Sequence, residues 1–225
     1  NQMDLTEGEL LPMTIADPNT RVVAMYLEGV RDGRLFVENA RKATRKKPVL
    51  AIKVGRSESG RAAVASHTGA LAGRDVAYDA AFRKAGVIRV QTTEEVFDRA
   101  RALAWCPLPH GRRIAVLTNA GGPGAIAADA LDSCGLKLAA LSADTTARLR
   151  EILPPAASVR NPVDMLAAAA AAEYANGLSA LMSDDGVDGV ILILAPPPMT
   201  TAAGIAGAII PMIRSATKPV IVTLM

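Results

Sequence analysis

Short apolar runs rich in Val, Ile and Leu alternate with helix-like segments along this chain. Such runs are typical of strands in a parallel sheet, which crossover helices bury on both faces. The runs that predict strands lie at residues 21–26, 49–54, 87–90, 114–118, 138–141, 189–194 and 220–224. The expected fold class is therefore α/β, with parallel sheets flanked by helices.

The helices between these strands are predicted from their caps, charges and composition. The segment at residues 75–85 has acidic residues early and basic residues late, which suits the helix dipole, and Gly86 follows as a C-cap. Thr92 precedes another helix as an N-cap, with glutamates in the first turn. The remaining predicted helices lie at residues 34–44, 125–133, 145–152, 167–182 (an alanine-rich run) and 200–215, and residues 159–165 are predicted as a loop.

A proline-rich break divides the pattern into two halves. Residues 107–111 (PLPHG) are predicted as a linker, because the cycle of strands and helices starts again after them. We therefore expect two consecutive α/β domains, at residues 1–106 and 112–225. The chain opens without a strand and ends on one, so we expect it to be part of a longer polypeptide.

The composition disfavours several classes of function. The net charge is +3 with scattered charges, and one Trp, three Tyr and three Phe are too few to stack nucleic-acid bases, so we expect neither a nucleic-acid nor a membrane partner. No apolar run reaches the ~18–20 residues that span a bilayer, and no signal segment opens the chain. The two cysteines are far apart, as in reduced cytoplasmic proteins, and we expect that location.

His67 lies in a run of small residues (SHTGALAG) that we predict as a loop between a buried strand and a helix. A neutral imidazole nitrogen can accept a phosphoryl group near neutral pH. Ser66, Thr68 and the amides near Gly69 can donate to the phosphate oxygens. The alternative is a histidine that only forms hydrogen bonds within its loop. A metal site is disfavoured, because no other histidine or cysteine cluster completes a ligand shell.

Two glycine-rich segments follow predicted strands, at residues 55–60 and 119–124. Ligands of open parallel sheets bind at this carboxyl edge. In the second segment (NAGGPG), glycines let a phosphate approach the backbone amides at the start of a helix. Its spacing matches neither the Walker pattern nor GxGxxG, so a plain tight turn is the alternative.

Other polar groups lie near these segments. Glu28 ends a predicted strand at the same sheet edge as His67, where its carboxylate can orient the imidazole; a helix cap or a surface acid is the alternative. Residues 161–164 (NPVD) are either an Asx-Pro turn or an anchor beside the second glycine segment. The basic residues at 41–47 are interpreted as a solvated helix end.

Together these segments resemble the NDP-forming acyl-CoA synthetases, the superfamily of ADP-forming acetyl-CoA synthetase and succinyl-CoA synthetase. The resemblance covers essentially the whole chain and is carried by YLEG at 26–29, KVGRS at 53–57, SHTGALAG at 66–73, NAGGPG at 119–124 and NPVD at 161–164. It implies two flavodoxin-like CoA-ligase domains. It also implies an acid–thiol ligase that interconverts acyl-CoA, ADP and phosphate with the acid, CoA and ATP.

The resemblance further implies residue roles. His67 is the phosphorylated histidine, Glu28 orients it, and the helix after residues 119–124 is one of two helices whose N-termini point at the phosphate. The implied phosphate-binding residues are Ser66, Thr68, Gly69, Asn119, Ala120, Gly121, Gly122 and Gly124. The implied substrates are CoA or acyl-CoA, phosphate and Mg-ADP or Mg-ATP, and neither a metal site nor a tightly bound cofactor is expected.

The family's CoA-binding and ATP-grasp domains are expected in the same protein or in a partner subunit, and the family implies a homo-oligomer. Residues 166–172 depart from the Thr/Gly-rich sequence expected after NPVD, which weakens a substrate role for that loop. One alternative function is a non-catalytic, acyl-CoA-sensing region of a protein lysine acetyltransferase, and another is a purely structural fragment. The intact His67 favours the ligase, because such regulatory regions tend to lose this histidine.

Overall fold

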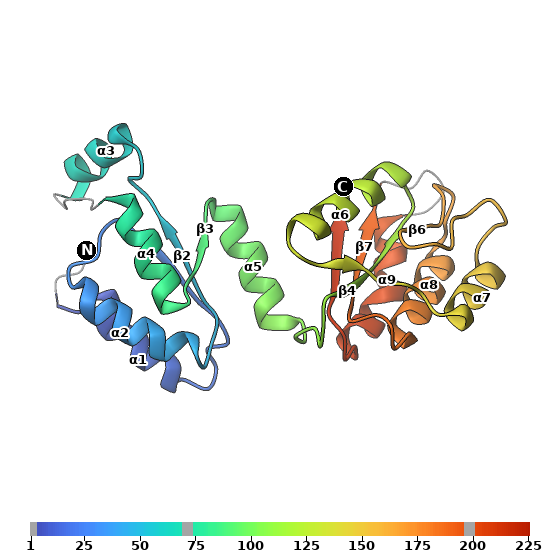
Figure 1. Ribbon diagram of the computed structural model, residues 1–225, viewed down its shortest axis with the longest axis horizontal. Helices are drawn as coiled ribbons and strands as arrows, with labels where there is room; N and C mark the ends of the chain where they lie inside the picture. The colour runs from blue at the N-terminus through green and yellow to red at the C-terminus, as the bar shows by residue number, and fades with distance from the viewer. Residues whose placement is uncertain (1–3, 69–73, 196–200) are drawn as a thin grey trace. The chain divides into compact units, whose positions relative to one another are not determined.

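The computed structural model describes residues 4–68, 74–195 and 201–225, apart from the side chains of residues 67 and 68, and it divides the chain into two compact units (Figure 1). The first unit ends at Trp105 and the second begins at Cys106. Each unit contains a parallel sheet with helices on both faces, which confirms the predicted α/β class. Among the described helices, none combines the length and the apolar character that crossing a membrane requires.

The first unit contains a three-stranded sheet in the order β1-β2-β3. Successive residues of a strand point to opposite faces, so Val49 and Ala51 pack toward α1, α2 and α4, whereas Leu50 and Ile52 pack toward α5. The elements are α1 (Glu7–Ala16), β1 (Val23–Leu27), α2 (Gly33–Thr44), β2 (Val49–Lys53), α3 (Glu58–Thr68), α4 (Asp75–Ala85), β3 (Ile88–Val90) and α5 (Thr93–Trp105).

The second unit contains a five-stranded sheet in the order β5-β4-β7-β8, and β6 also pairs with β4. Strand β5 pairs with the start of β4 and β6 with its end, so the two short strands follow one another along β4. The elements are β4 (Arg113–Thr118), α6 (Gly121–Ser133), β5 (Lys137–Leu138), α7 (Ala143–Ile152), β6 (Val163–Asp164), α8 (Ala171–Ser183), β7 (Gly189–Leu194), α9 (Ala202–Arg214) and β8 (Val220–Leu224).

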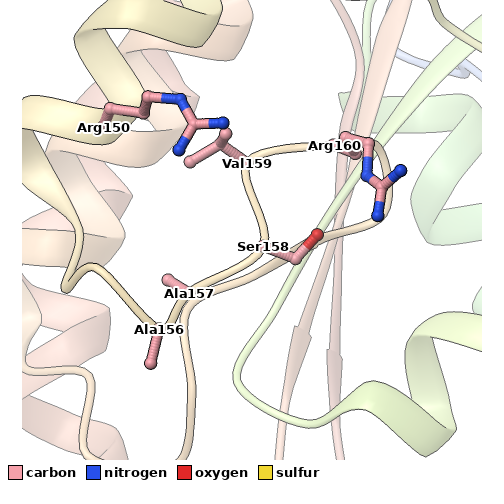
Figure 2. A pocket seen from close by; sticks show the side chains of 6 residues that line it. All are labelled: Arg150, Ala156, Ala157, Ser158, Val159 and Arg160. Carbon is pink, nitrogen blue, oxygen red and sulfur yellow. The ribbon is translucent and has the colours of Figure 1, made fainter.

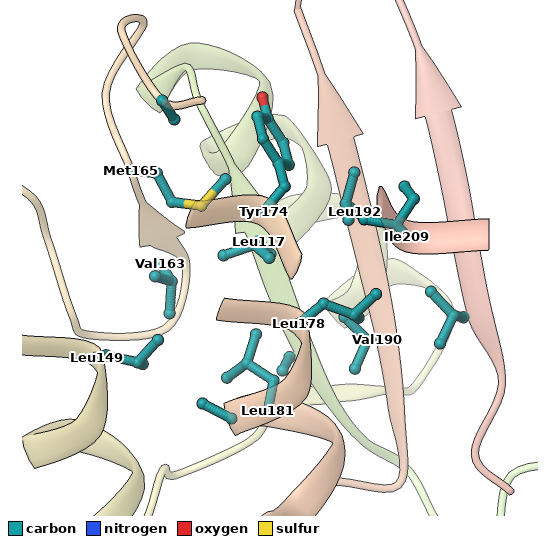
Figure 3. Packing of buried hydrophobic residues seen from close by; sticks show 14 of the residues in the cluster. Leu117, Leu149, Val163, Met165, Tyr174, Leu178, Leu181, Val190, Leu192 and Ile209 are labelled. Atoms are coloured by element: carbon teal, nitrogen blue, oxygen red, sulfur yellow. The ribbon is translucent and has the colours of Figure 1, made fainter. Parts of the chain in front are cut away.

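The main core of the second unit lies between its sheet and the helices α7, α8 and α9 (Figure 3). Leu117 of β4 and Leu192 of β7 face this layer, and Val116 points to the opposite face, which α6 covers. Tyr174 of α8 is fully buried in the main core. Burial raises the pKa of Tyr174 to about 12, and no described residue forms a hydrogen bond with its hydroxyl. This core fixes the end of β4, where the second glycine segment begins.

We predicted a loop at residues 66–73. That prediction is wrong for residues 66–68, because they form the last turn of helix α3, and residues 69–73 lie outside the described residues. Gly55, with a φ of 69°, turns the chain after β2. The hydroxyl of Ser57 then accepts a hydrogen bond from the Gly60 N–H at 3.1 Å, which is how a helix N-cap acts. Helix α3 has alanines at residues 62, 63 and 65, directly before this turn, and alanine is the strongest helix former.

Two corrections concern the second unit. Helix α6 begins at Gly121, so the glycines predicted as a turn form its first turn. The alanines at residues 167–170 are not helical, because Leu166 adopts a left-handed φ of 70° and its N–H donates to the Asp164 carboxylate at 2.9 Å. This local turn outweighs the helix propensity of alanine. Helix α8 begins only at Ala171.

Besides α3, two elements are absent from the sequence-based prediction. Helix α1 opens with a capping box, in which the Thr6 N–H donates to the Glu9 carboxylate at 2.8 Å and the Glu9 N–H donates to the Thr6 hydroxyl at 3.4 Å. The Thr-x-x-Glu spacing is a known helix start, so the sequence held a signal for it. Strand β6 lies within the predicted loop at residues 159–165 and is only two residues long.

Candidate functional site

The second glycine segment lies where β4 ends and α6 begins. Asn119 is buried, its Nδ2 donates to the Ala195 carbonyl at 3.0 Å, and its Oδ1 accepts from the Ala195 N–H at 2.9 Å. The Ala120 N–H donates to the Thr118 hydroxyl at 3.0 Å, and that hydroxyl lies 3.0 Å from the Ala120 carbonyl. The polar side chain of Asn119 and the N–H of Ala120 are therefore already engaged within the protein.

The N–H groups of Gly121 and Gly122 are the available donors at the start of α6. Both residues are exposed, and no described residue accepts a hydrogen bond from either N–H. Pro123 has no N–H, and the Gly124 N–H donates within the helix to the Ala120 carbonyl at 3.3 Å. A helix N-terminus carries partial positive charge, so these two free donors form a position suited to an anion.

Asn161 anchors this site from the edge of β4. Its Oδ1 accepts from the Val116 N–H at 2.9 Å, and its Nδ2 donates to the carbonyls of Ile114 at 2.8 Å and Ala139 at 3.0 Å. Strand β5 pairs with the first residues of β4, and β6 pairs with its last residues. The Asn161 amide forms hydrogen bonds with the β4 backbone in the gap between these two short strands. Of the two roles considered for the NPVD motif, the anchor is the one observed.

Close packing also holds the first turn of α6 against the NPVD segment. A Cβ on Gly124 would stand 3.2 Å from a Thr118 methyl carbon and 3.4 Å from Cβ of Pro162, whose preceding peptide bond is cis. A Cβ on Gly121 would stand 3.2 Å from Oδ2 of Asp164. Gly124 therefore leaves the space in which the first turn of α6 packs against the NPVD segment.

In the first unit, Glu28 follows β1 and Lys53 ends β2. Glu28 is half-buried, and no described residue forms a hydrogen bond with its carboxylate. Lys53 is only 2% exposed; its ammonium donates to the Val54 carbonyl and lies 4.7 Å from the centroid of the Tyr78 ring. Burial lowers the pKa of Lys53, and the negative charges of Asp75 and Glu28 partly oppose that shift.

The remaining predicted site residues belong to the end of α3. His67 and Thr68 lie in the last turn of this helix, with their side chains outside the described part of the structure. Ser66 is exposed, and its hydroxyl donates to the Ala63 carbonyl at 2.8 Å. Gly69 lies outside the described residues. The first unit thus holds the two predicted catalytic residues, and the second unit holds the glycine segment.

The two halves of the chain match two family models. Residues 1–103 match the succinyl-CoA ligase like flavodoxin domain, and residues 114–225 match the ligase-CoA domain. The chain belongs to the NDP-forming acyl-CoA synthetase family. The flavodoxin-like expectation and the resemblance drawn from the motifs are thereby confirmed.

This chain is similar to proteins that are named as ADP-forming ligases. It is 45% identical to subunit alpha of acetate–CoA ligase (ADP-forming) II from Pyrococcus furiosus, over 93% of this chain and 47% of that subunit. It is 36% identical to 4-hydroxybutyrate–CoA ligase (ADP-forming) from Nitrosopumilus maritimus, over 100% of this chain and 32% of that protein.

A solved structure supports the same family. The chain superposes with a TM-score of 0.89 and 36% identity on the dinucleotide forming acetyl-coenzyme A synthetase 1 of Ca. Korarchaeum cryptofilum, in complex with phosphate and ADP. The match covers 98% of this chain and 48% of that one. The chain thus spans about half the length of that synthetase and of the Pyrococcus subunit.

A hollow of about 390 Å³ in the second unit contains none of the predicted synthetase residues (Figure 2). Arg150 comes from α7, and Arg160 lies in the segment that leads to β6. The lining residues are Arg150, Ala156, Ala157, Ser158, Val159 and Arg160. Both arginines are exposed, so the hollow has no buried polar group that would select a ligand. Within residues 4–68, 74–195 and 201–225, no group of three His, Cys, Asp or Glu residues is arranged to hold a metal ion.

The sequence analysis assigned no role to Lys53 or to Asn161 individually. A lysine at the end of an otherwise apolar strand was a usable signal, because lysine is almost never fully buried without a reason. The role of Asn161 depends on two short strands that leave a gap along β4, and no local pattern in the synthetase sequence predicts such a gap.

Proposed function

We propose that this chain is the phosphoryl-carrying part of an ADP-forming acyl-CoA synthetase. The observation that carries the proposal is the match of both halves to ligase domains, in a chain that also has His67, Glu28 and a free helix N-terminus at Gly121 and Gly122. The proposed enzyme interconverts acyl-CoA, ADP and phosphate with the acid, CoA and ATP. The names of its ADP-forming relatives support this reaction class.

The proposed reaction has three reversible steps. A phosphate oxygen attacks the thioester carbonyl of acyl-CoA, the carbon–sulfur bond breaks, and CoA leaves as its thiol after taking a proton. A ring nitrogen of His67 then attacks phosphorus, and the bond from phosphorus to the acyl oxygen breaks, with its electron pair leaving on the carboxylate. Finally, an oxygen of the ADP β-phosphate attacks phosphorus, and the electrons of the N–P bond return to His67.

In the first unit, Glu28 is proposed to accept a hydrogen bond from the other ring nitrogen of His67. That bond keeps the proton away from the reacting nitrogen, which retains its lone pair. Ser66, Thr68 and Gly69 are proposed to donate to the phosphoryl oxygens.

In the second unit, the free N–H groups of Gly121 and Gly122 are proposed to bind the phosphate. A phosphoryl group carries about −1.5 to −2 charges, and each charged hydrogen bond contributes roughly 1.5–3 kcal/mol. The helix terminus adds roughly 0.3–1 kcal/mol. We propose that the other three residues, Asn119, Ala120 and Gly124, shape the turn instead. The Asn119 amide and the Ala120 N–H are already hydrogen-bonded within the protein, and neighbouring side chains pack closely against Gly124.

Other parts of the enzyme are needed for full turnover. The chain spans about half of the Pyrococcus subunit and of the Korarchaeum synthetase and 32% of the Nitrosopumilus ligase, which supports the proposal that CoA-binding and ATP-grasp domains act with it, in the same protein or in a partner subunit. CoA or acyl-CoA and Mg-ADP or Mg-ATP are the proposed substrates of the whole enzyme. We further propose that it works as a homo-oligomer in the cytoplasm.

The second candidate function is that of a non-catalytic, acyl-CoA-sensing region of a protein lysine acetyltransferase. It assigns the same domains to acyl-CoA sensing without phosphoryl transfer. The presence of His67 favours the synthetase, because sensing alone gives no use for a phosphoryl acceptor. An experiment that detects phosphohistidine therefore separates the two functions.

The test is phosphohistidine formation on the protein, with the ATP-grasp domain or subunit of its family and labelled Mg-ATP. The chain has two histidines, so His110→Asn, at an exposed position, is a matched control for His67→Asn. We expect acid-labile, base-stable label on the wild type and on His110→Asn, and none on His67→Asn. Label that persists in His67→Asn contradicts the assignment, and no label on the wild type beside an active partner favours the sensing function.

A further inference from the structure

Lys53 carries a buried charge that the proposed roles do not explain. Its side chain is 2% exposed and lies at the end of β2, the central strand of the first sheet. Removing an ammonium group from water is costly unless it is paired, and apolar replacements of buried charges often stabilise a protein. A methionine would fill a similar volume without that cost, so the charge itself is expected to have a use.

The surroundings of Lys53 do not give it a close acidic partner. Among the described residues, its ammonium has one hydrogen-bond acceptor, the Val54 carbonyl, and it lies over the Tyr78 ring. No ion pair within 4.0 Å joins it to a described acid. Asp75, whose charge also acts on Lys53, is bound to Arg89 at 2.6 Å.

Glu28 is the other acid whose negative charge acts on Lys53. Unlike Asp75, it has no hydrogen bond or ion pair with any residue in the described ranges. Leu27 pairs with Lys53 across the two strands, and the Val54 N–H donates to the Leu27 carbonyl at 3.0 Å. Glu28 therefore follows directly on the strand that neighbours Lys53.

Tyr78 of α4 connects the same two segments. Its hydroxyl accepts a hydrogen bond from the Val30 N–H at 3.2 Å, which ties the helix to the segment that follows Glu28. Its ring lies 4.7 Å from the Lys53 ammonium, a cation–π arrangement. The ammonium and the Glu28 segment are thus held by one side chain.

We infer that Lys53 is a positioning residue, whose buried ammonium holds the Glu28 carboxylate at the sheet edge where it orients His67. The inference rests on the proposed function. Attraction to Lys53 restricts the free carboxylate of Glu28 while leaving its oxygens available to the imidazole. Arg89 cannot replace Lys53 in this role, because Asp75 and Asp79 already neutralise it.

A purely structural role for Lys53 makes a different prediction. If the side chain only fills the core, Lys53→Met keeps a similar volume, and the folded variant is phosphorylated at the wild-type rate. If its charge positions Glu28, Lys53→Met leaves the unfolding temperature unchanged or raises it, because a buried charge is removed, and still slows the reaction of folded protein.

The experiment measures the rate of phosphohistidine formation at saturating Mg-ATP, with the family's ATP-grasp domain, in the protein and in four variants. These are Lys53→Met, Lys53→Arg, Glu28→Gln and the double variant Lys53→Met/Glu28→Gln. Lys42→Met, an exposed lysine in α2, controls for the loss of one positive charge. Circular dichroism and thermal unfolding accompany each rate.

We expect Lys53→Met to slow phosphorylation by about 10-fold. An effect of this size is typical of the interaction between two residues that act together. Lys53→Arg, which keeps the charge, recovers part of the rate, and Lys42→Met matches the wild type. In the Glu28→Gln background, Lys53→Met causes little further loss, because its effect acts through Glu28.

The inference is overturned if the rate loss of the double variant equals the product of the losses caused by Lys53→Met and Glu28→Gln. It is also overturned if Lys53→Met is phosphorylated at the wild-type rate. Either result leaves phosphorylation of His67 intact, so the proposed function survives. If the wild type is not phosphorylated at His67, the proposed function fails first, and the role of Lys53 fails with it.

Discussion

The side-chain amide of Asn119 exchanges two hydrogen bonds with the backbone of Ala195, at 3.0 and 2.9 Å. Asn119 follows β4 and Ala195 follows β7, so this pair continues the pairing of the two strands beyond their last residues. It fixes the point from which α6 starts. The consequence is that Asn119 acts on the proposed phosphate site through the backbone, not through its own amide.

We predict that Asn119→Ala destabilises the second unit by roughly 1–3 kcal/mol, because it leaves the Ala195 N–H and carbonyl without their partner. Urea unfolding of the protein, followed by hydrogen exchange in β4 and β7, measures the loss. Asn176→Ala, at an exposed position of α8, is the matched control and is expected to change little. Equal stability of the two variants contradicts this role of Asn119.

All the strands except β6 and most helices of both units could be predicted from sequence, because their signals are local. The helix at Asp75–Ala85 agrees at both ends, and Gly86 adopts the left-handed conformation expected of a C-cap, with a φ of 73°. The helix predicted at residues 167–182 is confirmed from Ala171 onward, but residues 167–170 were predicted wrongly, because a turn set by Asp164 is stronger there than propensity. Propensity ranks conformations, but one specific hydrogen bond can reverse that rank.

The roles of the candidate residues were harder to predict, because within each unit they depend on contacts between residues that are distant in sequence. The motifs identified His67 and the glycine segment, yet nothing local indicates that Asn119 faces Ala195 or that Asn161 bonds to β4. The buried environment of Lys53 likewise depends on Tyr78, from a helix that follows β2 in the chain. Sequence motifs can therefore name the residues of this site more readily than they can assign their tasks.

Asn161→Ala is predicted to be more disruptive than Asn119→Ala. It removes hydrogen bonds to Val116, Ile114 and Ala139, and the backbone groups on β4 lie in the buried sheet. We expect a loss of about 2–4 kcal/mol, since each buried group left unpaired costs roughly 1–3 kcal/mol. Urea midpoints of the two variants provide the comparison, and a smaller loss for Asn161→Ala refutes the anchor role.

The glycines of α6 are predicted to differ sharply in their tolerance of a methyl group. An alanine at Gly124 meets Thr118 and Pro162 at 3.2 and 3.4 Å, so we expect a loss of roughly 1–3 kcal/mol from overpacking. An alanine at Gly122 meets nothing within 4 Å and keeps its N–H, so stability and phosphorylation should be retained. Thermal unfolding and the phosphohistidine assay test both variants, and a matching loss at Gly122 rules out this account.

Acid sensitivity of the second unit is predicted from Asp188. Its carboxylate accepts hydrogen bonds from the Arg113 side chain at 2.9 and 2.7 Å and from the Arg113 N–H at 2.9 Å, and these bonds lower the pKa of Asp188 to about 2. An aspartate in the unfolded chain has a pKa of about 4. Between these values the unfolded state binds more protons, so stability is complete above about pH 4 and is lost as the pH falls toward about 2.

Asp188→Asn is therefore expected to be less stable than the wild type at neutral pH and to lose less stability in acid. The two stability curves should converge as the pH approaches about 2, since protonation removes the same charge that the substitution removes. Asp185→Asn, at the exposed neighbouring acid, should follow the wild-type curve. Urea unfolding between pH 7 and pH 2, with exchange protection of β4 and β7 as the local readout, measures this. Parallel curves for wild type and Asp188→Asn would show that the bonds to Arg113 do not set the acid response.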